Sequence, residues 1–557
     1  MLLTAIISVV VAPRPHILFI LQDDLGHYNV AFNANRTDEP SADVSHVSPH
    51  LTALAREGII LDRHYVHWHC SPSRRSFLTG RLPLHHGEEL SSIASDDIDL
   101  RWRTIGQKLQ SVGYESHWYG KGHTGYKSMN HLPVRLGFSA GHLGFLSGAM
   151  SYHGAARWMG EKPFHATTYS TDLYGEAAVA ALQAYDPSKG KPLFMYLPWQ
   201  AVHTPYTAPP DWNASAQRCD HYAKACIVYG MLSVADNYVG NLTRLLQQKQ
   251  MWSSTLLIFS ADNGGVTSGV NYPLRGEKHT NWDGGMRVAA FVSGGFIPPS
   301  LRGSVSKVIV HISDWYPTLA RLAGADPTDD PPVPPLPIDP SEPHKDIYGE
   351  RSFPPVDGVD VWPHLLDAGA NETAAHESLW LSREVLLARG EAGRVHKLIV
   401  AQPSPEIMVS KSINNGWKVP NGTWMPSDEH VYGCEAYGKR DVFRPCIFEL
   451  ISDPREMTNL ALGDPALLGR MWAQLNRTQL SEFHARTPAK LLGPCHPRCA
   501  RRHWASLSAD ASGAEALGYD TSSYDAETWP NADLEIQANG AHIGPVCGVP
   551  GCAWPED

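Results

Sequence analysis

The residues with the clearest chemical potential lie in one short stretch, CSPSRRSFLTGR, which begins at Cys70. Ser71 suits a helix N-cap, Pro72 suits the first helical position, and Gly80 can end the helix. We therefore expect Cys70 at the entrance of a short helix, where backbone N–H groups and the helix dipole favour an anion. Arg74 follows one turn later, on a face that can point back toward Cys70. The stretch predicts a site for an oxyanion ester.

Hard oxygen ligands follow two apolar runs, HILFIL and TLLIFS, that are typical of buried parallel strands. These ligands are Asp23, Asp24, Asp262 and Asn263. Open α/β sheets bind ligands at the carboxyl ends of their strands. Carboxylate and amide oxygens suit Ca²⁺, suit Mg²⁺ less well, and do not suit zinc. Each pair is also a common turn composition, so a solvated turn remains the alternative.

Two lysines and two histidines complete the candidate set. Lys121 and His123 stand two residues apart in a glycine-rich turn, His203 follows the apolar run 192–199, and Lys278 ends the segment NYPLRGEK. Taken singly, each has a plain structural interpretation, as a lysine in water, a surface histidine or a histidine in a proline-fixed loop.

The stretch at Cys70 resembles the signature of the sulfatase family, C-x-P-S-R-x-x-x-L-T-G. The matching residues are Cys70, Pro72, Ser73, Arg74, Leu78, Thr79 and Gly80. In that family the cysteine is oxidised during secretion to formylglycine, an aldehyde that hydrates to a gem-diol. One hydroxyl attacks sulfur and expels the alcohol, and the second expels sulfate and restores the aldehyde. The resemblance implies hydrolysis of an aryl or sugar sulfate, with a formylglycine-generating enzyme as a partner in maturation.

The resemblance covers residues 13–485 and is closest in pattern to the arylsulfatase B (N-acetylgalactosamine-4-sulfatase) branch. It implies one Ca²⁺ ion, whose ligands would be Asp23, Asp24, the converted Cys70, Asp262 and Asn263. Arg74 would orient the diol, Lys121 and Lys278 would bind sulfate, His203 would contact the substrate and protonate the leaving alcohol, and His123 would accept a diol proton. The position after Lys121, often tryptophan in the family, is glycine in this chain.

The fold implied by the resemblance is α/β. It has a large mixed, mainly parallel sheet sandwiched by helices, as in alkaline phosphatase, and a smaller C-terminal α+β domain with an antiparallel sheet. We expect a short signal segment at 1–12, a catalytic domain at 13–343, the smaller domain at 344–485 and a cysteine-containing tail at 486–557. Helical patterns cover residues 48–58, 102–112 and 222–250.

Composition limits the partners and the compartment. The chain has 557 residues, 43% of them apolar, and a net charge of −11, which argues against a nucleic-acid partner. Its 28 histidines would offset that charge in mild acid. Beyond the N-terminal run, no segment approaches the roughly 20 apolar residues of a membrane span. We therefore expect a luminal protein, either lysosomal or extracellular, without a membrane span.

Modification signals also indicate the secretory pathway. Six N-x-S/T sequons are glycosylation candidates, at Asn35, Asn213, Asn241, Asn371, Asn421 and Asn476. Eight cysteines remain besides Cys70, an even number that favours disulfides in an oxidising compartment. The close pairs are Cys219 with Cys226 and Cys434 with Cys446, although the sequence does not fix the connectivity.

Two other functions remain open from the sequence. A phosphodiesterase or phosphonate hydrolase of the same superfamily would use similar metal chemistry. A relative with a decayed site would bind sulfated glycans without hydrolysing them.

Overall fold

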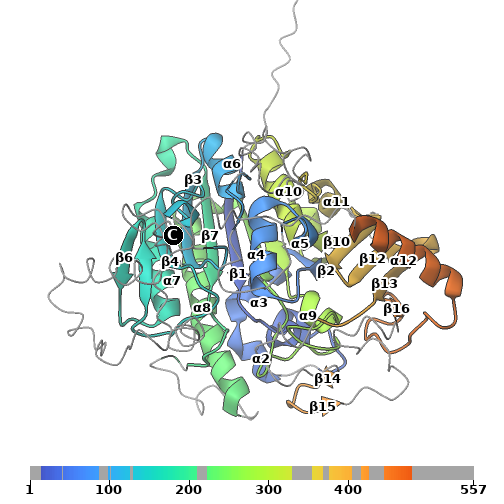
Figure 1. Cartoon of the computed structure of the whole chain (residues 1–557). Helices are drawn as coiled ribbons and strands as arrows, with labels where there is room; N and C mark the ends of the chain where they lie inside the picture. The colour runs from blue at the N-terminus through green and yellow to red at the C-terminus, as the bar shows by residue number, and fades with distance from the viewer. Residues whose placement is uncertain are drawn as a thin grey trace, which may run out of the picture.

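The computed structural model of the chain is shown in Figure 1. The residues that the structure describes are 14–39, 42–86, 98–100, 102–125, 129–207, 209, 223–328, 354–367, 375–403, 416–425 and 445–479. The expected signal segment, the tail after 486, Asn213 and Asn371 lie outside these ranges.

A ten-stranded mixed sheet forms the centre of the molecule. In spatial order its strands are β10 (Ser304–His311), β2 (Ile59–Tyr65), β9 (Phe291–Ser293), β8 (Thr255–Ala261), β1 (His16–Gln22), β7 (Leu193–Trp199), β3 (Glu115–Lys121), β4 (Gly141–Phe145), β5 (Ala156–Met159) and β6 (Lys162–His165). The strands from β8 through β1, β7 and β3 to β4 run parallel, whereas β9, β5 and β6 pair antiparallel with their neighbours. The arrangement confirms the predicted mixed, mainly parallel sheet.

The strands β1, β7 and β8 are buried along nearly their whole length because helices and loops cover both faces of the sheet. Every residue of β7 and β8 is buried, as are all but the first of β1. Such strands show a continuous apolar run instead of alternation, which is why the sequence revealed them. Phe19 on β1 contacts Phe77 of α4 (Cys70–Thr79) and Trp315 of α10 (Trp315–Leu322), so these two helices cover its side of the sheet.

The predicted helices are confirmed, with ends shifted by one to three residues. They are α3 (Pro49–Arg56), α6 (Ile105–Ser111) and α8 (Ala223–Gln248). The long helix α8 packs against both α3 and α7 (Ser170–Ala184). Among the described residues, no helix has the length and apolar character needed to cross a bilayer.

A smaller antiparallel sheet lies beside the β2 and β10 side of the large one (Figure 1). Its strands, in order, are β11 (Ser378–Ser382), β12 (Val385–Arg389), β13 (Val395–Ile399) and β16 (Cys446–Glu449). One face packs against Tyr65, Trp282 and Met286, and the other is covered by α12 (Pro465–Gln479). This confirms the predicted small antiparallel domain, while the boundaries at 343 and 485 stay predictions.

A buried ion network joins the two sheets. Lys397 of β13 places its Nζ 2.7 Å from Oδ1 of Asp283 and 2.8 Å from Oε1 of Glu456, and all three side chains are buried. The second carboxylate oxygen of Glu456 accepts a hydrogen bond from the Asp283 N–H, and Tyr65 donates its hydroxyl to Asp283. The lysine therefore separates two carboxylates that would otherwise face each other without water.

Lys397→Met is expected to lower the free energy of unfolding by about 3–5 kcal/mol, because it leaves buried carboxylates without their cation. Lys189→Met, at an exposed position, is the matched control and should change it by less than about 0.5 kcal/mol. Urea unfolding followed by tryptophan fluorescence measures both. Equal midpoints for the two variants would mean that the network does not hold the sheets together.

Two of the predicted disulfide cysteines lie within the described residues. Cys226 and Cys446 are both disulfide-bonded, and Cys70 is the free thiol among the three described cysteines. Their predicted partners Cys219 and Cys434 lie outside the described residues, so the pairings stay predictions.

Candidate active site

Polar side chains from four neighbouring strands meet at one edge of the large sheet. These residues are Asp23 and Asp24 after β1, Asp262 and Asn263 after β8, His203 after β7, and Lys121 at the end of β3. Gln22 pairs with Trp199 on one side and Ala261 on the other, so the three central strands end level. The edge thus collects residues that lie far apart along the chain.

Helix α4 carries Cys70 to this edge, but it begins earlier than its sequence predicts. Cys70 is the first helical residue, and the N-cap is His69 instead of Ser71. Ser73 explains the shift, because its hydroxyl accepts the His67 N–H at 3.0 Å and fixes the segment before the helix. Gly80 ends the helix as expected, with φ of +70° and no room for a Cβ beside Tyr316.

The Cys70 thiol is 1% exposed and lies within a cage of charges. Its Sγ is 2.9 Å from Nζ of Lys278, 3.5 Å from Oδ1 of Asp23 and 4.0 Å from Oδ1 of Asp24. Burial acts to raise the pKa of the thiol, but the nearby lysines outweigh it, so the pKa lies below its ordinary value. A group at this position is therefore stabilised when it carries negative charge.

Arg74 is fixed by the carboxylate that follows β8. Its Nε and Nη2 donate to Oδ2 of Asp262 at 2.9 and 2.7 Å, and its Nη1 donates to the Lys121 carbonyl at 3.2 Å. Its side chain is fully buried. Burial opposes ionisation of Asp262, but Arg74 holds the pKa of that carboxyl below its usual range. The pair is thus charged and rigid beneath Cys70.

The two lysines are paired with different carboxylates. Lys121 donates to Asp23 at 2.7 Å, and Lys278 donates to Asp24 at 2.6 Å. Burial and the nearby Asp262 raise the pKa of Asp23 to about 8, whereas Lys278 and His203 overcome burial and lower the pKa of Asp24. At Asp23, burial thus outweighs the attraction of Lys121, and a bound cation would favour the charged carboxylate.

The donor set fits a hard divalent cation. Ligand atoms of Asp23, Asp24, Cys70 and His203 all lie within 4.8 Å of one another. Asn263 donates its amide to Asp24 at 2.8 Å, while its buried Oδ1 has no hydrogen-bond partner. An amide oxygen held beside carboxylates without a donor is a suitable ligand for Ca²⁺ or Mg²⁺. The sequence placed His203 among the substrate contacts, so its position in this cluster is a new finding.

The two candidate histidines differ in their surroundings. Nδ1 of His203 donates to the Thr204 carbonyl at 2.6 Å, which turns Nε2 toward Asp24, 3.6 Å away. Burial acts to lower the pKa of His203, but Asp24 and Asp23 raise it above its ordinary value. The ring of His123 lies against Gly148, with its centroid 5.6 Å from that of His69.

Two further histidines surround the entrance of α4 and were missed in the sequence. The ring centroids of His69 and His279 are 5.3 Å apart, and each ring has a buried Nδ1 without a hydrogen-bond partner. Burial and Lys278 lower the pKa of both, that of His279 to about 3, so both are neutral. The sequence marks these two histidines only by their positions, because His69 directly precedes Cys70 and His279 directly follows Lys278.

Comparison with known proteins gives consistent matches. The family profile named Sulfatase matches residues 15–325. Mouse arylsulfatase J is 33% identical over 336 residues, which are 56% of this chain and about half (52%) of that protein. Human N-acetylgalactosamine-6-sulfatase is 26% identical over 546 residues, covering 91% of this chain and 92% of that protein.

Solved structures match in fold. The crystal structure of Ps i-CgsB aligns with a TM-score of 0.63 and 21% identity, over 91% of this chain and 100% of that chain. The PsFucS1 sulfatase from Pseudoalteromonas sp. aligns with a TM-score of 0.58 and 21% identity, over 85% of this chain and 92% of that chain. The likeness to the arylsulfatase B branch stays a prediction.

Proposed function

Because the chain belongs to the sulfatase family, we propose that it hydrolyses a sulfate ester, with the nucleophile formed from Cys70. One observation carries the proposal: the free, buried Cys70 lies at a helix N-terminus with Lys278 at 2.9 Å and two carboxylates within 4.0 Å. Formylglycine at this position would supply a hydrated aldehyde with two hydroxyl groups, one as the nucleophile toward sulfur and the other to permit the later release of sulfate. The charges of Lys278, Asp23 and Asp24 around the thiol support this proposal.

A cation would be held by the carboxylates at the sheet edge. The proposed ligands are Asp23, Asp24, Asp262 and Asn263, together with the oxygen that replaces the Cys70 sulfur. Ca²⁺ suits this set of oxygen donors, and when bound it supplies positive charge next to the sulfate oxygens. Arg74 holds Asp262 in place and compensates its charge.

The lysines position the sulfate group. Lys121 and Lys278 are anchored on Asp23 and Asp24, so their ammonium groups lie at fixed positions around Cys70. They would donate hydrogen bonds to sulfate oxygens as negative charge moves onto the leaving group. Because these ammonium groups are already in position, they need not rearrange during the reaction.

His203 is the proposed general acid and His123 the proposed base. The raised pKa of His203 keeps Nε2 protonated in mild acid, as protonation of a departing alcohol requires. His123 would accept the proton whose loss drives sulfate release. His69 and His279 line the same entrance and, being neutral, can both donate to and accept from hydroxyl groups.

His203→Gln is expected to lower kcat about 10²-fold or more for a sugar sulfate, whose alcohol leaves poorly without a proton. It should lower kcat much less for 4-nitrophenyl sulfate, whose phenolate leaves unaided. Because the pKa of His203 is raised, sugar sulfate hydrolysis should persist in mild acid and fall as the pH rises through that pKa.

The control for this prediction is His153→Gln, at an exposed position. Steady-state rates of the two substrates between pH 4 and 9 provide the measurement. If the rate of the His203 variant falls at high pH as it does in the unmodified protein, another group is the general acid.

The substrate class follows from the relatives and remains a proposal. Arylsulfatase J and N-acetylgalactosamine-6-sulfatase point to aryl and sugar sulfates. The relatives and the disulfides of Cys226 and Cys446 favour the secretory pathway, lysosomal or extracellular. The described sequon asparagines are all exposed, as glycosylation requires: Asn35, Asn241, Asn421 and Asn476.

The proposed function is tested by mass spectrometry and by rates on the same protein. Chain secreted from a eukaryotic host should show, in the tryptic peptide of Cys70, a loss of about 18 Da relative to the thiol, as a formylglycine aldehyde requires. The same preparation should hydrolyse 4-nitrophenyl sulfate much faster than 4-nitrophenyl phosphate. Converted protein that prefers the phosphate would instead make this a phosphoryl hydrolase, and converted protein inactive on both aryl and sugar esters would favour a binding protein.

A further inference from the structure

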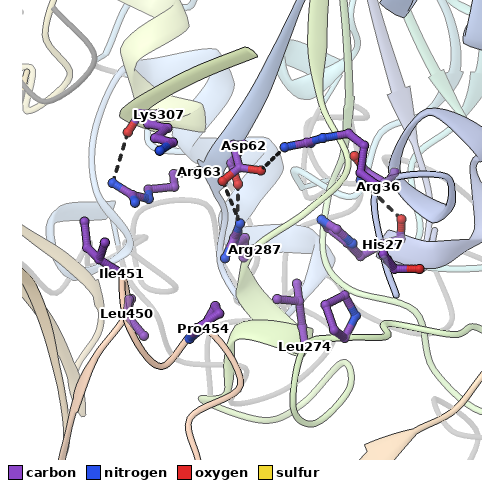
Figure 2. A pocket seen from close by; sticks show the side chains of 13 residues that line it. His27, Arg36, Asp62, Arg63, Leu274, Arg287, Lys307, Leu450, Ile451 and Pro454 are labelled. Atoms are coloured by element: carbon purple, nitrogen blue, oxygen red, sulfur yellow. Dashed lines mark hydrogen bonds and ion pairs between the residues drawn. The ribbon is translucent and has the colours of Figure 1, made fainter. Parts of the chain in front are cut away.

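A cavity of about 260 Å³ lies where the loop after β16 packs against the β2 and β10 side of the large sheet (Figure 2). Its lining residues are His27, Asn33, Arg36, Thr37, Asp62, Arg63, Pro273, Leu274, Arg287, Lys307, Leu450, Ile451 and Pro454. None of them belongs to the candidate active site. The large sheet contributes Arg63 of β2 and Lys307 of β10, and the loop after β16 contributes Leu450 and Ile451.

The cavity is strongly basic in a chain that is acidic overall. Four cationic side chains line it, from Arg36, Arg63, Arg287 and Lys307, against the single carboxylate of Asp62. Both oxygens of that carboxylate are already used, because Oδ1 accepts from Arg36 at 2.7 Å and Oδ2 from Arg287 at 3.0 Å. The local excess of positive charge therefore has no compensation within the lining.

Arg63 is the informative member of this group. Arg63 is 8% exposed, and its Nη1 donates a hydrogen bond to the Lys307 carbonyl at 3.3 Å. Among the residues that the structure describes, no carboxylate lies within ion-pair distance of its guanidinium. Figure 2 shows Arg63 and the Arg287–Asp62 pair on adjoining sides of the hollow. A buried cation without a counter-charge is costly, and an anion in the cavity removes that cost.

We propose that this cavity is an anion-binding site for a sulfate-like tetrahedral group, separate from the catalytic centre. The group is either free inorganic sulfate or a sulfate carried by a sugar. Guanidinium groups bind such oxygens in pairs of parallel hydrogen bonds, and Arg63 has donors left for them. Leu274, Leu450 and Pro454 give the cavity an apolar side that suits a sugar ring. The volume admits a small anion or a single sugar ring and is below that of most drug-sized sites.

The test measures binding in a chain that cannot turn over, Cys70→Ala, so that sugar sulfates survive. Inorganic sulfate and galactose 6-sulfate are titrated into this protein and into Cys70→Ala with Arg63→Gln, by calorimetry at low salt. We expect an Arg63-dependent site whose affinity falls at least about 10-fold in the double variant, as loss of a charge-assisted hydrogen bond predicts. Tighter Arg63-dependent binding of the sugar identifies a glycan site, and tighter binding of sulfate identifies a free-anion site.

Controls separate this site from the active site and from misfolding. Lys307→Gln, at an exposed position, should weaken the same site without a risk to folding, whereas Arg321→Gln, 62% exposed on α10, should not. Arg63→Gln alone should leave 4-nitrophenyl sulfate hydrolysis unchanged. Loss of anion binding in the cavity can therefore be told apart from loss of enzyme activity. The proposal would be overturned if the Arg63, Lys307 and Arg321 variants all bound each ligand, inorganic sulfate and galactose 6-sulfate, with the same affinity. Crystals soaked in selenate should place the anion against Arg63, and a selenate found at Cys70 alone would also overturn it.

Discussion

Cys70→Ser is expected to abolish steady turnover, with a loss of at least about 10³-fold, and to leave one sulfate group bound per chain. A serine hydroxyl at the N-terminus of α4 keeps the position of the nucleophile and the contacts of Lys278. It can attack sulfur once. Because it has no second hydroxyl on the same carbon, it cannot expel sulfate, and the sulfated protein accumulates.

Intact-protein mass spectrometry after incubation with an aryl sulfate shows the added group. Cys70→Ala is the matched control, since it should neither turn over nor gain mass. Steady hydrolysis by the serine variant would rule out the requirement for two hydroxyl groups. A serine variant that neither turns over nor gains mass would place the nucleophile elsewhere.

Asp262→Asn is expected to remove the bound metal and to lower kcat/KM at least about 100-fold. The substitution keeps the shape of the side chain and an oxygen that can accept from Arg74, now 2.7 Å from Oδ2. It removes the negative charge that pairs with the guanidinium and that would hold the proposed cation. We also expect a loss of about 2 kcal/mol in stability, because the hydrogen bonds to Arg74 lose one charged partner.

Asp236→Asn provides the comparison for a buried carboxylate. Asp236 accepts the N–H groups of His50 and Leu51 at 3.0 and 2.7 Å at the start of α3, away from the candidate site. Its loss should lower stability by a similar amount and leave the metal content unchanged. Metal is measured by plasma mass spectrometry after dialysis, beside urea unfolding. Retention of one ion per chain by the Asp262 variant would remove this residue from the ligand set.

The sequence revealed the parts of the site that follow fully buried strands. The strands β1, β7 and β8 are continuous apolar runs, so their ends could be located and the polar residues after them recognised. By contrast, β3 has the sequence ESHWYGK, with no apolar run, and Lys121 was assigned to a turn. Gly120 permits this strand, because a Cβ there would meet the Pro198 carbonyl oxygen at 2.1 Å.

Features that depend on long-range contacts could not be predicted. His69 occupies the N-cap position of α4, without a side-chain capping hydrogen bond, because Ser73 folds back onto His67. The local propensity of Ser71 did not indicate this start. His69 meets His279 only because the loop after β8 returns to Cys70. The basic cavity draws Arg36, Arg63 and Arg287 from separate segments, and single arginines in a sequence carry no spacing pattern.

The cage around Cys70 also sets an order of events during synthesis. Lys278 lies 208 residues after Cys70, and until it is in place one wall of the cage is missing. At roughly 5–20 residues per second, the ribosome needs on the order of 10–40 s to make that stretch. Under the proposed function, an enzyme that converts Cys70 would have this interval in which to reach the thiol, because a chain that folded first would bury it unreacted. The yield of active protein would then depend on whether conversion of Cys70 is faster than folding.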